Sequence, residues 1–343
     1  MRVLLLFGVL PVAGGGDWPM WRYDAGRTAS SPHGLPGGLS LRWTRVFTPR
    51  EQVCDDPLNH DLMPYDRGFE PVVLGSRMFV PFNDTDQVLA LDTRDGRELW
   101  RFTADGPVRL PPVAVDVRVF VVSDDGWLYC LRADDGGVAW RFRGAPVARK
   151  AIGNDRLISA WPARGGPVIR DGVVYFAASI WPFMGTFIYA LDATTGRVRW
   201  VNDGTGADYL KQPHSAFSFA GVAPQGALVA TEQVLLVPGG RSVPAAFDRA
   251  TGELLHFEIN AGGKGNGGSF VAASDAEYFV HTRKRGVRAF DLKTGRKTAF
   301  ACNEPVLADG RLYTALPEGQ LGQAVEAAEA MVLSADYDVV RAQ

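Results

Sequence analysis

Cationic and aromatic residues gather in a few irregular stretches of this 343-residue chain, and these residues could carry chemistry. Arginine and lysine bind anions, and tryptophan rings stack on aromatic or cationic groups. Together they would suit an anionic or aromatic ligand. The candidates for a ligand-binding site are Trp161, Arg164, Trp181, Lys211, His214 and Arg241. For each of them taken singly, packing or plain surface exposure is the alternative interpretation.

A recognisable catalytic set is missing from the sequence. It contains no Ser-His-Asp arrangement, zinc-binding helix or haem-attachment motif. His60 lies near Asp55, Asp56 and Asp61, but carboxylates without a fixed loop pattern are usually solvated rather than bound to metal. The glycine-rich stretch 261–269 lacks the spacing of a phosphate-binding loop, and a strand pattern follows it. We therefore assign no catalytic residue and no metal ligand.

The three cysteines form no Cys-x-x-Cys motif. Cys130 lies on an expected strand and is interpreted as a small buried apolar residue. Cys54 and Cys302 lie in expected loops, where they could pair, but sequence alone does not place their Cα atoms.

The element that must position these residues is a repeated β-hairpin, seen most clearly in residues 187–200. Phe187, Tyr189 and Leu191 alternate with other residues in the period of two typical of a half-buried strand. Asp192 and Gly196 then supply turn chemistry, since aspartate accepts backbone N–H groups and glycine tolerates a positive φ. The same register returns elsewhere, with turn glycines at positions 96, 136, 196, 252 and 295.

The spacing of these hairpins predicts the fold class. A repeat of about 40 residues with strand content is typical of propeller blades, each a four-stranded sheet. Short Pro-Val and aromatic-aliphatic strands precede the hairpins, so four strands per unit can be counted. We predict an all-β propeller with six visible units, and expect its tryptophans 100, 140 and 200 to pack between blades. Longer relatives could have seven or eight blades.

The unit Ala-Leu-Asp-x-x-Thr-Gly-x-x-x-Trp resembles the blade motif of the pyrroloquinoline-quinone-binding-like (PQQ-like) β-propeller repeat family. The resemblance covers roughly residues 17–316, and the runs 161–168 and 238–245 look most like its uncharacterised extracytoplasmic branch. Because the repeat consists almost wholly of architectural residues and no catalytic set is recognisable, we expect a non-catalytic module of the cell envelope that binds a protein, glycan or small ligand through inserted loops on one face. The alternatives are a PQQ-dependent dehydrogenase acting on alcohols or sugars, and a scaffold in envelope protein assembly.

A dehydrogenase of this family would need PQQ and Ca²⁺, with a stacking tryptophan, Glu and Asn or Asp ligands and a catalytic aspartate. That acid set cannot be placed on this sequence, and the neighbouring-cysteine pair of many such enzymes is absent. No cofactor is therefore predicted, and PQQ with Ca²⁺ stays open as the alternative. A net charge of −2 gives no general attraction to nucleic acid. We expect a monomer with no transmembrane segment.

The two ends of the chain depart from the repeat. Residues 1–16 follow the order of a secretory signal peptide, which predicts export to the periplasm or beyond; an N-terminal strand is the alternative. Residues 317–343 form a degenerate or truncated tail, of helix-forming composition in part. The segment around Trp18 and Trp21 is expected to lie over the propeller, with Arg22, Asp24 and Arg27 either facing the channel mouth or pinning the segment. A lone strand near Trp43 is expected to close the ring.

Overall fold

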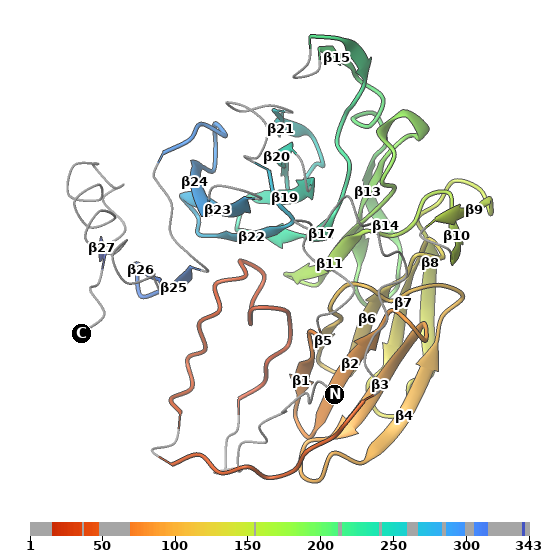
Figure 1. Ribbon diagram of the computed structural model, residues 1–343, viewed down its shortest axis with the longest axis vertical. Helices are drawn as coiled ribbons and strands as arrows, with labels where there is room; N and C mark the ends of the chain where they lie inside the picture. The colour runs from red at the N-terminus through yellow and green to blue at the C-terminus, as the bar shows by residue number, and fades with distance from the viewer. Residues whose placement is uncertain are drawn as a thin grey trace.

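The computed structural model describes residues 16–35, 38–47, 69–153, 156–211, 215–239, 242–258, 267–282, 286–298, 305–314 and 338–339 (Figure 1). Within these ranges the chain forms a succession of antiparallel sheets and one short 3-10 helix, η1 (Pro182–Met184). The sheets follow one another around a common centre, from orange to blue in the figure. The predicted all-β class is confirmed for this part of the chain.

The sheets are built in sequence order. The first contains β1 (Val72–Leu74), β2 (Arg77–Phe82), β3 (Gln87–Asp92) and β4 (Glu98–Thr103), and the second β5 (Val113–Val115), β6 (Arg118–Val122), β7 (Trp127–Arg132) and β8 (Val138–Arg143). The third contains β11 (Gly165–Arg170), β12 (Val173–Ala178), β13 (Phe187–Asp192) and β14 (Val198–Asn202), with β17 (Gly226–Ala227) added parallel to β11.

The later sheets follow in the same order. The fourth contains β18 (Val229–Ala230), β19 (Val234–Gly239), β20 (Ser242–Asp248) and β21 (Leu254–His256), and the fifth β22 (Phe270–Ala273), β23 (Glu277–Thr282) and β24 (Gly286–Asp291). The last consists of β25 (Val306–Ala308), β26 (Arg311–Tyr313) and β27 (Asp338–Val339). Two separate hairpins pair β9 (Lys150–Gly153) with β10 (Arg156–Ser159), and β15 (Tyr209–Lys211) with β16 (Phe217–Phe219).

The turn between β13 and β14 has the chemistry that its sequence predicts. The Asp192 carboxylate accepts the backbone N–H groups of Thr194 (3.1 Å) and Thr195 (2.9 Å). Gly196 has φ +71°, a conformation that a residue with a Cβ resists. The other four turn glycines named above also have positive φ, between +66° and +77°.

Each outer-strand tryptophan docks on the turn of the following sheet. A Cβ added to Gly136 would lie 2.6 Å from the Trp100 ring, and the Trp100 indole N–H donates to the carbonyl of Ala133 at 3.0 Å. Trp200 lies over Gly252 in the same way and donates to Arg249 at 3.1 Å. The predicted packing of tryptophan between units is therefore confirmed, and it runs in one direction around the molecule.

The last described copy of this contact uses histidine instead. His256 lies over Gly295, and its Nε2 is 3.0 Å from the carbonyl oxygen of Leu292. An imidazole nitrogen thus takes the place of the indole nitrogen in the fourth unit.

The core lies between the sheets. Phe120, Phe176 and Phe247, which come from three successive sheets, belong to one buried cluster and are 0 % exposed. Cys130 is buried in the same cluster, as its sequence context predicts, and burial raises the pKa of its thiol to about 11. A thiol with this pKa is almost wholly protonated at neutral pH and is unreactive.

Residues 18–28, which we call the strap, cross the inner strands of the sheets (Figure 1, red). Trp18 exchanges backbone hydrogen bonds with Val73 (2.8 and 2.9 Å). Further along, strap carbonyls accept backbone N–H groups from the inner strands of later sheets. The pairs are Pro19 with Ala114, Ala25 with Ala230, Gly26 with Ala273 and Thr28 with Leu307.

Arg27 anchors the strap from inside. Its side chain is 0 % exposed and donates to the carbonyls of Leu228 (3.0 Å), Pro167 (2.9 Å) and Trp21 (3.1 Å). Burial lowers its pKa to about 10. Of the two sequence-based interpretations, pinning is therefore the one that the structure supports for Arg27.

The segment around Trp43 differs from the sequence prediction. Residues 38–47 form no strand, although a strand was expected there. The ring of Trp43 nevertheless lies over Gly96, and its indole donates to the carbonyl of Thr93 at 2.9 Å. The tryptophan contact therefore forms without strand pairing. The signal segment, Cys54, Cys302, the His60 cluster and nearly all of the tail lie outside the described residues.

Candidate functional site

The insertions of this chain leave the sheets at one end. Neighbouring strands of each four-stranded sheet are antiparallel, so the turn between its first and second strands and the turn between its third and fourth strands lie at the same end of the sheet. The turn between the second and third strands and the links between sheets lie at the opposite end, which we call the insertion end. The two extra hairpins belong to such links, and η1 lies in the β12–β13 turn. Trp161, Arg164, Trp181 and Lys211 therefore all lie on connections at the insertion end.

Trp161 is used in packing. It is 8 % exposed, and its indole N–H donates to the carbonyl of Met184 at 2.9 Å. It forms a small cluster with Ala145, Ala160 and Ala178. Its ring thus holds the η1 loop against the link that precedes β11.

Arg164 belongs to a buried ionic group. Its guanidinium contacts both carboxylate oxygens of Asp124 (2.7 and 2.8 Å), and Arg109 contacts the same carboxylate at 2.6 Å. Burial would raise the pKa of Asp124, but the two arginines outweigh it, so the pKa lies below its usual value. Asp124 therefore stays ionised at neutral pH and fastens the loops of two sheets. Such a carboxylate is a poor general base.

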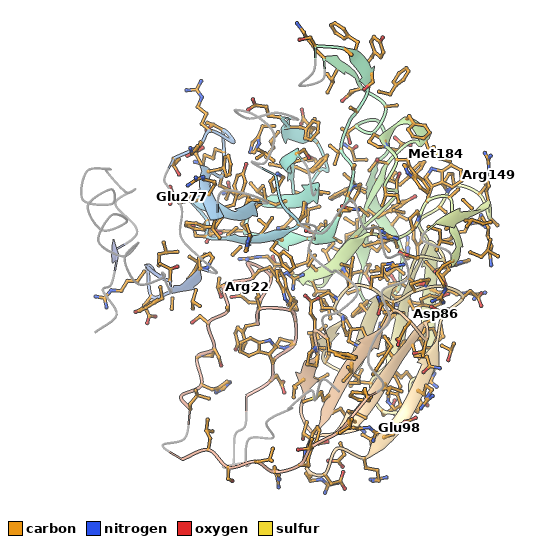
Figure 2. The ribbon with its side chains drawn as sticks, in the orientation of Figure 1. Arg22, Asp86, Glu98, Arg149, Met184 and Glu277 are labelled. Atoms are coloured by element: carbon orange, nitrogen blue, oxygen red, sulfur yellow. The ribbon has the colours of Figure 1, made fainter. Side chains whose placement is uncertain are left out.

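Trp181 precedes η1 and is half-buried. Its backbone N–H donates to the Ser179 hydroxyl at 3.2 Å, and its carbonyl accepts from Met184 at 2.9 Å. Phe183, in the middle of η1, is 62 % exposed. The loop is thus anchored at its base and apolar at its apex, near the Met184 label in Figure 2.

Lys211 lies on the β15–β16 hairpin, which projects from the insertion end (Figure 1, top). The register pairs Tyr209 with Phe219 and Lys211 with Phe217, so these four side chains share one face. The rings of Tyr209 and Phe217 stack with centroids 5.6 Å apart, and those of Tyr209 and Phe219 are 5.2 Å apart. The three aromatic side chains are nevertheless 60 %, 56 % and 56 % exposed.

The aromatic face of this hairpin escaped the sequence analysis. The alternation of Tyr209 with Lys211, and of Phe217 with Phe219, is the signal that could have revealed it. The hairpin is fixed at its base, where Ala220 donates to Asp208 (2.8 Å), Val222 donates to Thr205 (2.9 Å) and the Thr186 hydroxyl donates to Val222 (2.7 Å). His214 and Arg241 lie outside the described residues.

Two cavities flank the strap near the centre of the molecule. One, of about 230 Å³, is lined by Trp21, Arg22, Phe270 and His281 among others. Arg22 already donates to the carbonyls of Arg27 and Pro305. The other, of about 290 Å³, lies between the strap and the turns at the opposite end of the sheets. Neither contains any of the sequence-predicted candidates.

The fit of PQQ and Ca²⁺ can be tested on the described side chains. Among them, no group of three or more His, Cys, Asp or Glu residues could hold a metal ion. Trp100 and Trp200 face turn glycines rather than a cavity. No acid set for Ca²⁺ is therefore assigned among the described residues, and we derive no reaction step through this cofactor pair. Within the same ranges, no helix is long and apolar enough to cross a membrane.

Comparisons with known proteins agree with this architecture. A family model described as outer membrane protein assembly factor BamB matches residues 21–202, 111–258 and 188–299. BamB of Burkholderia pseudomallei is 26 % identical over 263 residues, which cover 66 % of this chain and 65 % of that protein. The serine/threonine-protein kinase AfsK of Streptomyces griseus is 34 % identical over 118 residues, 32 % of this chain and 13 % of the kinase. The chain thus spans less than two thirds of these relatives.

Solved structures show the same fold. The crystal structure of BamB from Moraxella catarrhalis matches 80 % of this chain and 72 % of its own, with a TM-score of 0.55 and 19 % identity. The quinohemoprotein alcohol dehydrogenase ADHIIG from Pseudomonas putida HK5 matches 91 % of this chain and 51 % of its own, with a TM-score of 0.55 and 15 % identity. At these identities the likeness concerns the fold alone. The matched family model covers most of the chain, which therefore belongs to the PQQ-like β-propeller family described as outer membrane protein assembly factor BamB.

Proposed function

We propose that this chain is a non-catalytic binding module of the cell envelope that holds a protein partner at its insertion end. The observation that carries the proposal is the aromatic face of the β15–β16 hairpin, with Tyr209, Phe217 and Phe219 more than half exposed. Large aromatic side chains are enriched at the centres of protein interfaces. A scaffold in envelope protein assembly is the form of this function that relationship to BamB favours.

The ionic chemistry of the described residues favours binding over catalysis. The buried carboxylate of Asp124 is neutralised by two arginines. Trp161, which the sequence offered as a stacking platform, is covered by its own loops. Phe183 on η1 and the aromatic face of the β15–β16 hairpin are exposed at the insertion end. Such side chains can bury apolar area against a partner.

The proposal extends to the shape and location of the molecule. We propose a ring of six blades, in which residues 39–47 complete the last blade beside β25 and β26. The support is Trp43, which docks on the first sheet as Trp100 docks on the second. We also propose a monomer exported from the cytoplasm, since residues 1–16 have the order of a signal peptide. A glycan or small ligand at the insertion end is the competing form of the binding function.

Site-directed cross-linking tests the protein-binding function. A photoreactive residue replaces Tyr209 in the full chain, produced in its native cells, and the cross-linked products are identified by mass spectrometry. We expect one dominant protein partner, whose yield falls at least about tenfold when Phe217→Ser and Phe219→Ser are added. The matched control is Val198→Ser with Val201→Ser on β14, whose side chains are both 45 % exposed.

Two results would contradict the proposal. In the first, the control pair lowers the cross-linking yield as much as the aromatic pair does, or neither changes it. In the second, the purified chain supplied with PQQ and Ca²⁺ shows a quinone absorption change and reduces a dye in the presence of alcohols or sugars.

A further inference from the structure

A strongly cationic stretch surrounds the second projecting hairpin, β9–β10. Residues 141–159 contain five cationic residues and one acidic residue, a formal charge of +4 in a chain whose net charge is −2. The cationic residues are Arg141, Arg143, Arg149, Lys150 and Arg156, and the acidic one is Asp155. Arg141, Arg143, Arg149 and Lys150 are exposed. The surface near the hairpin therefore favours an anionic partner.

The hairpin is fixed at both ends. Next to its turn, Arg156 contacts both carboxylate oxygens of Asp86, each at 2.6 Å, and thereby ties β10 to the β2–β3 turn. At its base, the backbone N–H of Ser159 donates to the carbonyl of Asp124 at 2.7 Å, and that of Ala160 donates to the carbonyl of Arg149 at 2.8 Å. Figure 2 shows Arg149 at the outer edge of the molecule. The hairpin is thus held in place at both ends.

Exposed apolar side chains lie on the hairpin between these two anchors. Ile152 and Leu157 are direct cross-strand partners and are 81 % and 56 % exposed. Val147, just before β9, is 52 % exposed. In contrast, Ile158 on the same hairpin is only 1 % exposed and packs inward. An amphipathic hairpin of this size would normally hide its aliphatic pair, so its exposure needs a reason.

Cations continue along the neighbouring strand β8. The guanidinium carbon of Arg141 lies 4.7 Å from the centre of the Trp127 ring, and that of Arg143 lies 5.9 Å from it. Arg143 is the last residue of β8, where the link that leads to β9 begins. Exposed cations therefore occur at both ends of that link, at Arg143 and at Arg149 and Lys150.

We propose that the β9–β10 hairpin docks on an anionic lipid surface, with Ile152 and Leu157 entering the interface and Arg149 and Lys150 contacting headgroups. Exposed aliphatic groups flanked by cations suit the boundary between headgroups and acyl chains. The exposed cations Arg149 and Lys150 distinguish this hairpin from the aromatic β15–β16 hairpin, and anionic lipid headgroups attract such charges. This contact goes beyond the proposed function, which uses the separate hairpin β15–β16.

Vesicle sedimentation tests the inference with the purified full chain. We expect binding to vesicles of phosphatidylglycerol with phosphatidylcholine, weaker binding at high salt, and little binding to phosphatidylcholine alone. Arg149→Glu with Lys150→Glu should lower the partition coefficient at least about tenfold. Ile152→Ser with Leu157→Ser should lower it severalfold, and salt should still weaken what remains.

The chain offers a matched control for the charge reversal. Arg296 and Lys297 are also adjacent and exposed, but they lie at the turn end of the fifth sheet, opposite the insertion end. Arg296→Glu with Lys297→Glu should leave the partition coefficient unchanged. Equal losses in both charge-reversed variants would overturn the proposal, and so would a lack of binding to anionic vesicles. Binding to soluble polyglutamate without binding to vesicles would overturn it in favour of an acidic protein partner.

Discussion

The contact between a tryptophan ring and a turn glycine is the smallest unit on which this molecule depends. The ring needs a flat surface, and the turn needs a left-handed residue; glycine satisfies both because it has no Cβ. The same two requirements meet at Gly96, Gly136, Gly196 and Gly252, each under the tryptophan of the preceding unit. These glycines are therefore constrained twice, once by φ and once by space.

The two constraints can be separated experimentally. Gly136 has φ +74° and Gly172 has φ +71°, but an added Cβ meets Trp100 at 2.6 Å in the first case and nothing within 4 Å in the second. Gly172→Ala should lower the free energy of unfolding by about 1 to 2 kcal/mol, because alanine is unfavourable in the left-handed conformation. Gly136→Ala should lower it by about 3 kcal/mol or more, because the Trp100 ring must also move. Urea unfolding measures both; equal losses would show that the ring contact contributes nothing.

Trp140 is an informative exception to the pattern. It lies over Gly196 as its counterparts lie over theirs, but its indole N–H is buried without a hydrogen-bond partner. The carbonyl of Ala193, which it would be expected to use, accepts instead from the Arg118 guanidinium at 3.1 Å. A cation thus replaces an indole as the donor at this turn, at the expense of one unsatisfied N–H group.

At the scale of the element, the turn aspartates make the hairpins sensitive to acid. The hydrogen bond from the Arg94 side chain is the main cause that lowers the pKa of Asp92 to about 2. Arg199 lowers that of Asp192, and Thr251 and Thr294 lower those of Asp248 and Asp291. Since these folded-state values lie below the unfolded value of about 3.9, each ionised aspartate stabilises the fold above that pH.

We therefore expect the free energy of unfolding to fall as the pH is lowered from about 5 towards 2. Burial raises the pKa of Asp86 and Asp125, so these two groups favour the folded state at low pH instead. The four turn aspartates with lowered pKa outnumber them. Asp248→Asn and Asp291→Asn together should flatten the acid side of the stability profile, because asparagine keeps an oxygen acceptor and does not titrate. Urea midpoints across this pH range provide the measurement, and an unchanged slope in the double variant would contradict the assignment.

The hairpins were predictable from sequence because their determinants are local. Period-two alternation, the turn aspartate and the turn glycine all lie within about 14 residues, and the strand pairs that they predict are present. The direction of tryptophan packing could not be predicted in this way, because it depends on contacts between residues of different units, about 30 to 50 positions apart in the sequence. Trp161 shows the limit in the site: sequence could report an aromatic residue in an insertion, but not that Met184 and three alanines cover it.

The projecting hairpins were harder to predict for a different reason. Each has strands of only three or four residues, too short for alternation to stand out from chance. Their significance comes from exposure, which depends on how the links leave the sheets. Lys211 was selected for its charge, whereas the property that distinguishes its hairpin is the row of rings beside it.

For the whole molecule, the strap connects sheets whose first strands are distant in sequence. Backbone hydrogen bonds join it to β1, β5, β18, β22 and β25, or to residues beside them, and Arg27 reaches the residue Pro167 of β11. Blades of a propeller otherwise contact only their neighbours, so stability in such arrays is close to a sum of local terms. A segment that bonds to six sheets couples their stabilities, because the loss of one contact with the segment weakens its contacts with the other sheets.

Removing the anchor of the strap should therefore loosen the inner strands of every sheet. Arg27→Leu leaves the carbonyls of Leu228, Pro167 and Trp21 without their buried donor, and we expect a loss of about 3 to 5 kcal/mol with a broader unfolding transition. Hydrogen exchange should rise at Ala114, Ala230 and Ala273, whose N–H groups bond to the strap. Arg42→Leu, on the segment that follows the strap, is the control and should change neither. If protection in Arg27→Leu falls only beside Leu228 and Pro167, the strap is a set of independent contacts and does not couple the sheets.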